Sequence, residues 1–280
     1  MKIKITADST CDLSKELIEK YNIRIIPLHI INGDNEDFID GVTMTPADIF
    51  KYVDSTGKTC HTAAINIDEF ETVFREELAE NDAVIHLSIS SDFSACYQNA
   101  TIAAELGSVY VVDARNLSTG SGLLVLAAAE LAQAGVDPAE IKARLDAQAA
   151  KVEASFVIDT LKYLHKGGRC SALTAMGANL LSLKPCIEVK NGKMGVGKKY
   201  RGSFDKVIKT YVNDRLSGRD DIDYSRVFIT HCMCSDEVVA SVRALVEELG
   251  EFKEILHTEA GCAVSNHCGP NTLGVLFCRK

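Results

Sequence analysis

Loops rich in hydroxyl groups and glycine follow several strand-like runs in the first half of the sequence. They read "TADSTCD", "KTCHTAAIN", "SISSDFSACY" and "VVDARNLSTGSG". Ligands of open α/β sheets bind beside the carboxyl ends of the strands, so we expect these loops to converge on one cleft. The candidate ligand contacts are Asp8, Ser9, Thr62, Ser90, Ser91, Ser94, Asp113, Ser118, Thr119, Gly120 and Gly122. The alternative for the Ser, Thr and Asp residues is a structural role, because these types cap helices.

A Lys-Gly-Gly-Arg turn occupies residues 166–169, within "LKYLHKGGRCS". Its two glycines permit close backbone approach or a positive φ, and its two cations attract anions. The turn is therefore compatible with phosphate binding, with contact to a partner protein and with simple reversal of the chain.

The sequence lacks the common catalytic motifs. No G-x-S-x-G, Walker A or H-E-x-x-H pattern occurs, and "GSGLLV" after Thr119 lacks the third glycine of a dinucleotide-binding loop. A hydrolase would need Ser94 beside His267, an arrangement that the sequence does not determine. His267 lies in "SNHCGPNTLG", which we interpret as a loop bounded by glycine and proline.

The ten cysteines suggest free thiols rather than a metal site or a disulfide framework. The nearest approach to a metal motif is "HCMC" at 231–234 together with "CAVSNHC" at 262–268. Neither segment has the C-x-x-C spacing of zinc sites, so we expect no metal and no other cofactor.

The bulk composition is that of a water-soluble globular protein. The 280 residues contain 46% hydrophobic types and carry a formal net charge of −9, which argues against nucleic-acid binding. No apolar run approaches the roughly 20 residues of a membrane span, and no secretory signal opens the chain. We expect a cytoplasmic protein.

Strand-like and amphipathic helical runs alternate through residues 1–154, which predicts an N-terminal α/β domain with a mostly parallel sheet and flanking helices. Expected strands are 2–8, 23–30, 83–89 and 109–114. Expected helices are 12–22, 45–53 (with Thr45 as N-cap and Pro46 first), 68–80, 94–107 and 120–135.

Residues 155–280 predict a C-terminal α+β domain with antiparallel strands, so that a ligand cleft lies between two domains. Strand-like pieces recur at 155–158, 185–200, 226–234, 252–259 and 274–280. Asn191-Gly192 stands between two extended runs, which predicts a hairpin with a type I′ turn.

The ordered set of segments resembles the DegV family of bacterial fatty-acid-binding proteins. The matching segments are "ADSTCDL", "IIPLHI" followed by Asp40-Gly41, "SSDFSACYQNA", "VVDARNLSTGSG", "YLHKGGR", "LKPCIEVKNGKM" and "HCGPNTLG". The chain departs from the family's usual residues at Ala63, Ala64, Asp92, Ala95 and Asn271.

The resemblance implies that Thr62, Ser94 and His267 surround the carboxylate of one long-chain fatty acid, with Ser9, Ser91, Ser118 and Gly120 as further candidates. It also implies an apolar tunnel, to which the segment "ALTAMGANLLSL" would contribute. The protein would have no catalytic activity alone and would present the carboxylate to a separate ATP-dependent fatty acid kinase. Arg169 and Arg201 would form the docking patch, with transient membrane contact. A Ser94-His267 acyl ester hydrolase and a lipid-sensing regulator are the alternatives.

Overall fold

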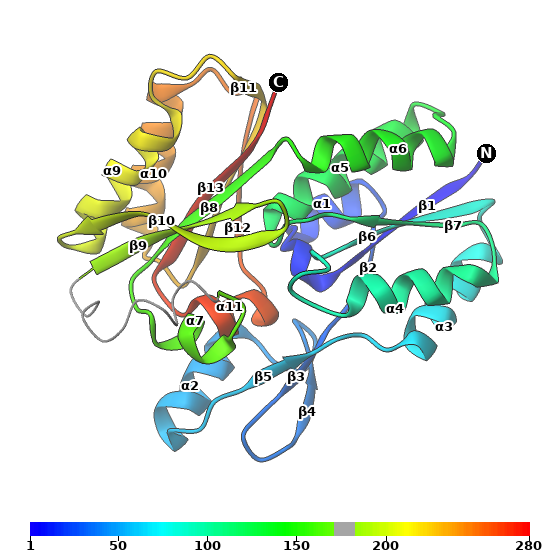
Figure 1. Cartoon of the computed structure of the whole chain (residues 1–280), viewed down its shortest axis with the longest axis horizontal. Helices are drawn as coiled ribbons and strands as arrows, with labels where there is room; N and C mark the ends of the chain where they lie inside the picture. The colour runs from blue at the N-terminus through cyan, green and yellow to red at the C-terminus, as the bar shows by residue number, and fades with distance from the viewer. Residues whose placement is uncertain (171–182) are drawn as a thin grey trace.

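The described residues form three β-sheets, whose arrangement Figure 1 shows. The computed structural model describes residues 1–170 and 183–280. The four-stranded sheet has the order β2-β1-β6-β7, and all of its pairs are parallel. Its strands are β1 (Ile3–Asp8), β2 (Arg24–Ile26), β6 (Ala83–Ser88) and β7 (Val109–Asp113). The predicted parallel sheet is therefore confirmed.

Helices lie on both sides of the four-stranded sheet, with α5 and α6 on one side and α3 and α4 on the other (Figure 1). Thr45 caps α2 in a capping box with Asp48, and Pro46 is its first residue, as predicted. The helical segments of this half are η1 (Ser9–Cys11), α1 (Lys15–Lys20), α2 (Pro46–Thr56), α3 (Ile67–Leu78), α4 (Cys96–Ala103), η2 (Ala104–Leu106), α5 (Thr119–Gln133) and α6 (Pro138–Ala149).

The prediction of one strand at 23–30 is wrong. The run breaks at Pro27, because proline has no N–H to donate to a strand ladder. β2 ends before it in the parallel sheet, and the next strand belongs to a separate three-stranded sheet that the sequence did not predict. This antiparallel sheet has the order β4-β3-β5 and consists of β3 (His29–Ile31), β4 (Asp37–Ile39) and β5 (His61–Ala63).

The six-stranded sheet has the order β10-β9-β8-β13-β11-β12. Asn191 (φ 52°) and Gly192 (φ 83°) form the turn between β9 and β10, which confirms the predicted hairpin. The other pairs are antiparallel except β11 with β12, which run parallel because α10 crosses over between them. The strands are β8 (Val152–Ile158), β9 (Leu183–Lys190), β10 (Lys193–Arg201), β11 (Ile222–Cys232), β12 (Glu254–Glu259) and β13 (Thr272–Arg279).

Helix α5 joins the two large sheets. Its small residues let it contact β1 and β6 on one side and β8 and β13 on the other. Alternate strand residues of the six-stranded sheet face opposite cores, since Phe156 and Ile158 join the larger cluster and Val157 the smaller one. The predicted domain boundary at 154/155 falls within β8 and stays a prediction.

The smaller core lies between the six-stranded sheet and two outer helices, α9 (Phe204–Leu216) and α10 (Asp236–Leu249). Two short helices, α7 (Lys162–Gly167) and α11 (Cys262–Cys268), contact each other near the centre of the molecule (Figure 1). Among the helices within the described residues, none is both long and apolar enough to cross a bilayer.

Candidate functional site

A cavity of about 560 Å³, here named the His267 cavity, lies where loops of the four-stranded sheet meet α11 and the β9–β10 hairpin. Loops after the carboxyl ends of β1, β6 and β7 contribute to its wall, as the sequence predicted. The lining residues are Thr10, Leu28, Thr62, Ala64, Ile89, Ser91, Asp92, Phe93, Ser94, Ala95, Gln98, Leu117, Arg169, Met194, Ala263, Val264, His267 and Cys268.

The wall includes five of the predicted ligand-contact and docking residues: Thr62, Ser91, Ser94, Arg169 and His267. The candidates that do not belong to the wall are Asp8, Ser9, Ser90, Asp113, Ser118, Thr119, Gly120, Gly122 and Arg201. The ligand and docking roles stay predictions for both groups.

Thr62 and His267 meet at one wall of the cavity. Thr62 is the middle residue of β5, so the prediction that it belongs to a loop is wrong. Its Oγ1 lies 3.1 Å from Nε2 of His267. His267 lies in the last turn of α11, so the prediction that it belongs to a loop is wrong. Burial and the nearby positive charge of Arg169 lower the pKa of His267 to about 4. The imidazole is therefore neutral at pH 7, and Thr62 and His267 form an uncharged hydrogen-bonding pair.

The Lys-Gly-Gly-Arg turn supports the imidazole from behind. A Cβ built at Gly167 would overlap Nδ1 of His267, so this position accepts only glycine without rearrangement. Gly168 has φ +68° and is the left-handed C-cap of α7. Arg169 is exposed, and its Nη1 donates to the carbonyl oxygen of Gly167 at 2.8 Å. The two glycines are thus needed for different reasons, close approach and a positive φ.

Two buried carboxylates hold the start of α11 in place. Asp40 accepts hydrogen bonds from the backbone N–H of Cys262 (2.7 Å) and Ala263 (3.3 Å), and Asp12 accepts from that of Gly261 (2.8 Å). These bonds satisfy N–H groups that have no partner inside the helix. Asp12 and Asp40 were not among the predicted site residues. Asp40-Gly41 and "ADSTCDL" did, however, stand out as family segments.

The hydroxyls of Ser9 and Ser118 bond to these same carboxylates. Ser9 Oγ donates to Asp40 at 2.7 Å, and Ser118 Oγ donates to Asp12 at 2.5 Å. Burial raises the pKa of Asp12 to about 8, because the hydrogen bonds from Ser118 and Gly261 only partly offset it and the charge of Asp40 adds to it. Both serines therefore contribute to the scaffold behind the cavity.

Other predicted contacts also have structural partners. Asp8 accepts from Ser88 Oγ (3.1 Å) and from the backbone N–H of Ile89 (2.8 Å), which ties β1 to the end of β6. Gly120 packs against the Asn116 side chain, Thr119 bonds to Thr230 at 2.5 Å, and Arg201 is exposed at the end of β10.

The tip of the β9–β10 hairpin docks beside the cavity. Ser90 Oγ donates to the carbonyl oxygen of Gly192 at 2.8 Å, and Arg115 Nη2 donates to that of Asn191 at 2.9 Å. Met194, just beyond the turn, lines the cavity. At the rim, Ser91 Oγ donates to Asp113 at 2.7 Å.

Ser94 lies two residues before α4, and its Oγ accepts from the N–H of Cys96, the first helical residue, at 3.2 Å and contacts Cys96 Sγ at 3.1 Å. Among the described residues no hydrogen bond joins Ser94 to His267, and Nδ1 of His267 has no hydrogen-bonding partner to orient it. A nucleophile activated by an oriented base needs both contacts. In the part of the chain that the structure describes, Ser94 and His267 have neither contact.

Metal ligands do not gather at this site. Within residues 1–170 and 183–280, no group of three or more His, Cys, Asp or Glu side chains is placed to hold a metal ion. The expected tunnel contribution of "ALTAMGANLLSL" lies, apart from Leu183, outside the described residues.

Comparison with known proteins identifies relatives over the full length. The profile of the family described as "Uncharacterised protein, DegV family" matches residues 2–280. A DegV domain-containing protein of Caldanaerobacter subterraneus subsp. tengcongensis is 31% identical, with 100% of this chain and 99% of the relative covered.

Solved structures of similar proteins share the fold. A DegV family protein from Thermus thermophilus, whose structure is described as fatty acid binding, superposes with a TM-score of 0.88 at 30% identity and covers 100% of both chains. DegV of Bacillus subtilis, described as a fatty acid binding protein, superposes with a TM-score of 0.85 at 25% identity, again over 100% of both chains.

Proposed function

The chain belongs to the DegV family, and from this premise we propose that it binds one long-chain fatty acid in the His267 cavity. One observation carries the proposal: the cavity combines the uncharged Thr62–His267 pair with walls of Leu28, Ile89 and Phe93. The fatty acid binding described for the Thermus and Bacillus proteins supports it. Thr62, Ser94 and His267 would surround the carboxylate. Thr62 and Ser94 would donate hydrogen bonds to it, and Nε2–H of His267 would donate to Thr62 Oγ1, so that the Thr62 proton points to the ligand.

The acyl chain would supply most of the affinity. About 14 methylenes at ~0.8 kcal/mol each offer roughly 11 kcal/mol before the cost of ordering. A small apolar space of about 30 Å³ shares Leu117, Val264 and Cys268 with the His267 cavity and continues to Phe156 and Leu276 on the six-stranded sheet. We propose that the tail runs in this direction, between the two large sheets.

Matched ligands test this proposal. Palmitate should bind the parent protein with one site per chain, and hexadecanol, which has the same tail without the carboxylate, should bind more weakly. A chromogenic palmitoyl ester measures the rival hydrolase activity in the same preparation. Turnover of the ester that disappears in Ser94→Ala would favour the hydrolase over the binding protein. Failure of both ligands to bind would exclude fatty acid binding.

We further propose that the protein presents the carboxylate to a separate ATP-dependent fatty acid kinase and has no catalytic activity of its own. Neutral donors suit this role, because a bidentate guanidinium would stabilise the carboxylate and weaken it as a nucleophile. Arg169 is an exposed cation in the cavity wall, so it can meet a docking partner or the transferring phosphate. The cytoplasmic location remains a prediction.

Arg169→Ala tests the presentation step. Palmitate affinity should change little, whereas acyl phosphate formation with ATP and the partner kinase should fall, with a weaker salt dependence than in the parent. Arg243→Ala, which removes an exposed arginine of α10, is the matched control. Equal acyl phosphate formation by all three proteins over a range of concentrations would exclude a docking role for Arg169.

A further inference from the structure

A second cavity of about 520 Å³, here named the arginine cavity, is separate from the His267 cavity. Of the described residues, none lines both. Its wall comes from the end of α6, from β8 and β9, from the tip of the β9–β10 hairpin and from α9 and β13. Its charged residues are Arg115, Lys190, Arg215, Arg219 and Arg279 with Asp146, Glu153 and Glu188.

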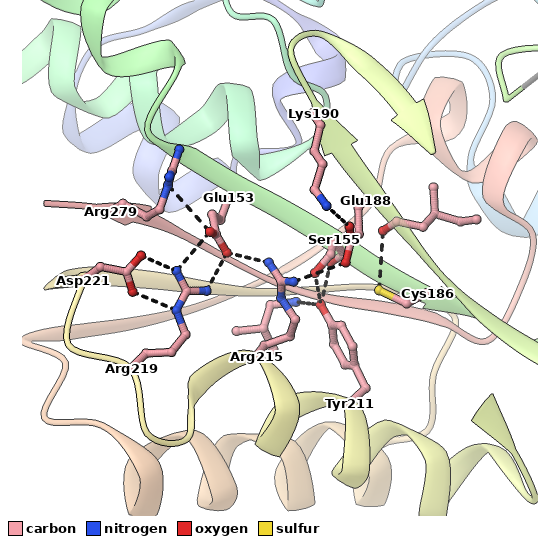
Figure 2. Close-up of polar contacts among 12 residues, drawn as sticks. Glu153, Ser155, Cys186, Glu188, Lys190, Tyr211, Arg215, Arg219, Asp221 and Arg279 are labelled. Carbon is pink, nitrogen blue, oxygen red and sulfur yellow. Dashed lines mark hydrogen bonds and ion pairs between the residues drawn. The ribbon is translucent and has the colours of Figure 1, made fainter. Parts of the chain in front are cut away.

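Three arginines of this wall converge on one carboxylate (Figure 2). Arg219 forms two bonds with Glu153, at 2.7 and 3.0 Å, and Arg215 forms one at 2.5 Å. Nε of Arg279 lies 3.6 Å from the same carboxylate. Burial alone would raise the pKa of Glu153, but the hydrogen bond from Arg219 and the charges of Arg215 and Arg279 hold it below its usual value. Glu153 is therefore ionised at neutral pH and keeps the guanidinium groups oriented.

The cluster has more donors than its carboxylates can accept, since each guanidinium carries five N–H groups. Nε of Arg215 is buried and has no hydrogen-bonding partner among the described residues. Arg115 donates to a backbone carbonyl, and no described carboxylate lies within ion-pair distance of it. The wall holds five cations and three carboxylates, and Asp221 pairs with Arg219 at 2.7 Å as a fourth carboxylate, which leaves a formal excess of one positive charge. This excess occurs on a chain whose net charge is −9.

A contribution to folding stability does not explain this cluster of charges well. Taking several charges out of water costs free energy that ion pairs repay only in part, so packed apolar residues would hold α9 against the sheet as well. The side chains of Arg215, Arg219 and Glu153 are each only about one-fifth exposed, at 19, 21 and 20%. In contrast, Lys190 is 77% exposed and pairs with Glu188 at 2.5 Å, and Arg279 is 43% exposed and donates to the carbonyl oxygen of Ala150 at 2.8 Å. Contacts at exposed side chains are weak, so a ligand can compete for both cations.

We propose that the arginine cavity binds a small organic molecule through its phosphate group. Guanidinium forks match phosphate oxygens in pairs, and the buried Glu153 network fixes them before the ligand arrives. The volume is within the range of small-molecule sites and exceeds the need of a bare anion. Asp146 and Glu188 in the same wall could accept hydrogen bonds from ligand hydroxyl groups.

Calorimetric titration of the full-length protein with AMP, and separately with inorganic pyrophosphate, tests this site. Ionic strength is held constant with sodium chloride, because a general charge effect would otherwise imitate binding. The test variant is Lys190→Gln/Arg279→Gln, which changes the two exposed cations of the wall. The matched control is Lys206→Gln/Lys209→Gln, which changes two exposed lysines of α9 outside the wall. Thermal melts without ligand establish that both variants fold.

Saturable binding of AMP to the parent should weaken by about tenfold or more in the test variant and stay unchanged in the control, since each lost charge-assisted contact is worth about that factor. Tighter binding of AMP than of pyrophosphate assigns the site to an organic phosphate. The proposal is overturned if AMP does not saturate the parent, if pyrophosphate binds as well as AMP, or if both variants bind AMP like the parent.

Discussion

At the scale of single residues, Thr62 and Ser94 should decide how tightly the carboxylate is held. Thr62→Ala and Ser94→Ala should each weaken palmitate binding by roughly 1 to 3 kcal/mol, because each leaves a charged head group short of a hydrogen bond. Calorimetry measures the loss, with Ser225→Ala as a control at an exposed serine.

Stability without ligand distinguishes this role from a structural one. Ser94→Ala should cost about 1 kcal/mol, because Ser94 Oγ accepts from Cys96 N–H, and Thr62→Ala should cost no more. A collapse of thermal stability in both variants would mean that the hydroxyls are needed for folding, and their assignment to the ligand would be wrong.

Gly167 should be as important for the site as the side chains that line it. In Gly167→Ala the added methyl group overlaps Nδ1 of His267, so either α7 or the imidazole must move. We expect at least tenfold weaker palmitate binding from this one methyl group, equivalent to about 1.4 kcal/mol. Gly195→Ala on β10 is the control, since a Cβ there meets nothing within 4 Å. Equal affinities of the two variants would contradict a role for close packing behind His267.

The sequence indicated which residues lie at the candidate site, but not the contacts that place them there. Thr62, Ser94 and His267, to which the family resemblance pointed, line the cavity, and their contact with a carboxylate stays a prediction. The sequence could not show that Gly167 packs on His267, since the two are 100 positions apart and meet only through tertiary contact between α7 and α11. It also offered no means to separate Ser9 and Ser118, which bond to buried carboxylates, from cavity residues.

At the scale of elements, the attachment of α11 should control the position of His267. Asp40→Asn leaves one acceptor oxygen where three donors now converge, from Ser9, Cys262 and Ala263. We expect a stability loss of about 1 to 3 kcal/mol and weaker palmitate binding. Chemical denaturation and calorimetry measure the two effects, and Asp54→Asn, at an exposed position of α2, is the control. If Asp40→Asn lowers stability but leaves palmitate affinity unchanged, the contacts of Asp40 with α11 do not control the position of His267.

Elements with strong local sequence signals could be predicted, and elements defined by tertiary contacts could not. The capped α2, the buried β6 and the Asn191-Gly192 hairpin carry local signals that are sufficient by themselves. Pro27 marks the break between β2 and β3 in the sequence, but which sheet each three-residue strand joins depends on tertiary contacts. The parallel pairing of β12 likewise depends on the path of α10. Helix α11 was missed because its first N–H groups are satisfied by Asp12 and Asp40, far away in sequence.

At the scale of the whole molecule, His267 should make stability depend on pH in a defined direction. The pKa of His267 is about 4 in the folded protein and about 6.5 in the unfolded chain. The contribution of neutral His267 to the free energy of unfolding is therefore complete above pH 6.5 and is lost as the pH falls towards 4. Between pH 7 and 4 the parent should lose roughly 3 kcal/mol more than His267→Gln. Urea unfolding of both proteins across this range measures the difference. Parallel stability curves would show that His267 titrates normally.

We propose that the two large sheets enclose one fatty acid whose carboxylate lies beside Thr62 and His267. Mass spectrometry of the purified protein under denaturing conditions tests this most directly, because an enclosed lipid should survive purification. We expect about one saturated or unsaturated acid of roughly 14 to 18 carbons per chain, because burial of the tail should supply most of the affinity. Protein recovered empty, and unable to take up any acid of that length when it is offered, would show that the cavity is not a fatty acid site.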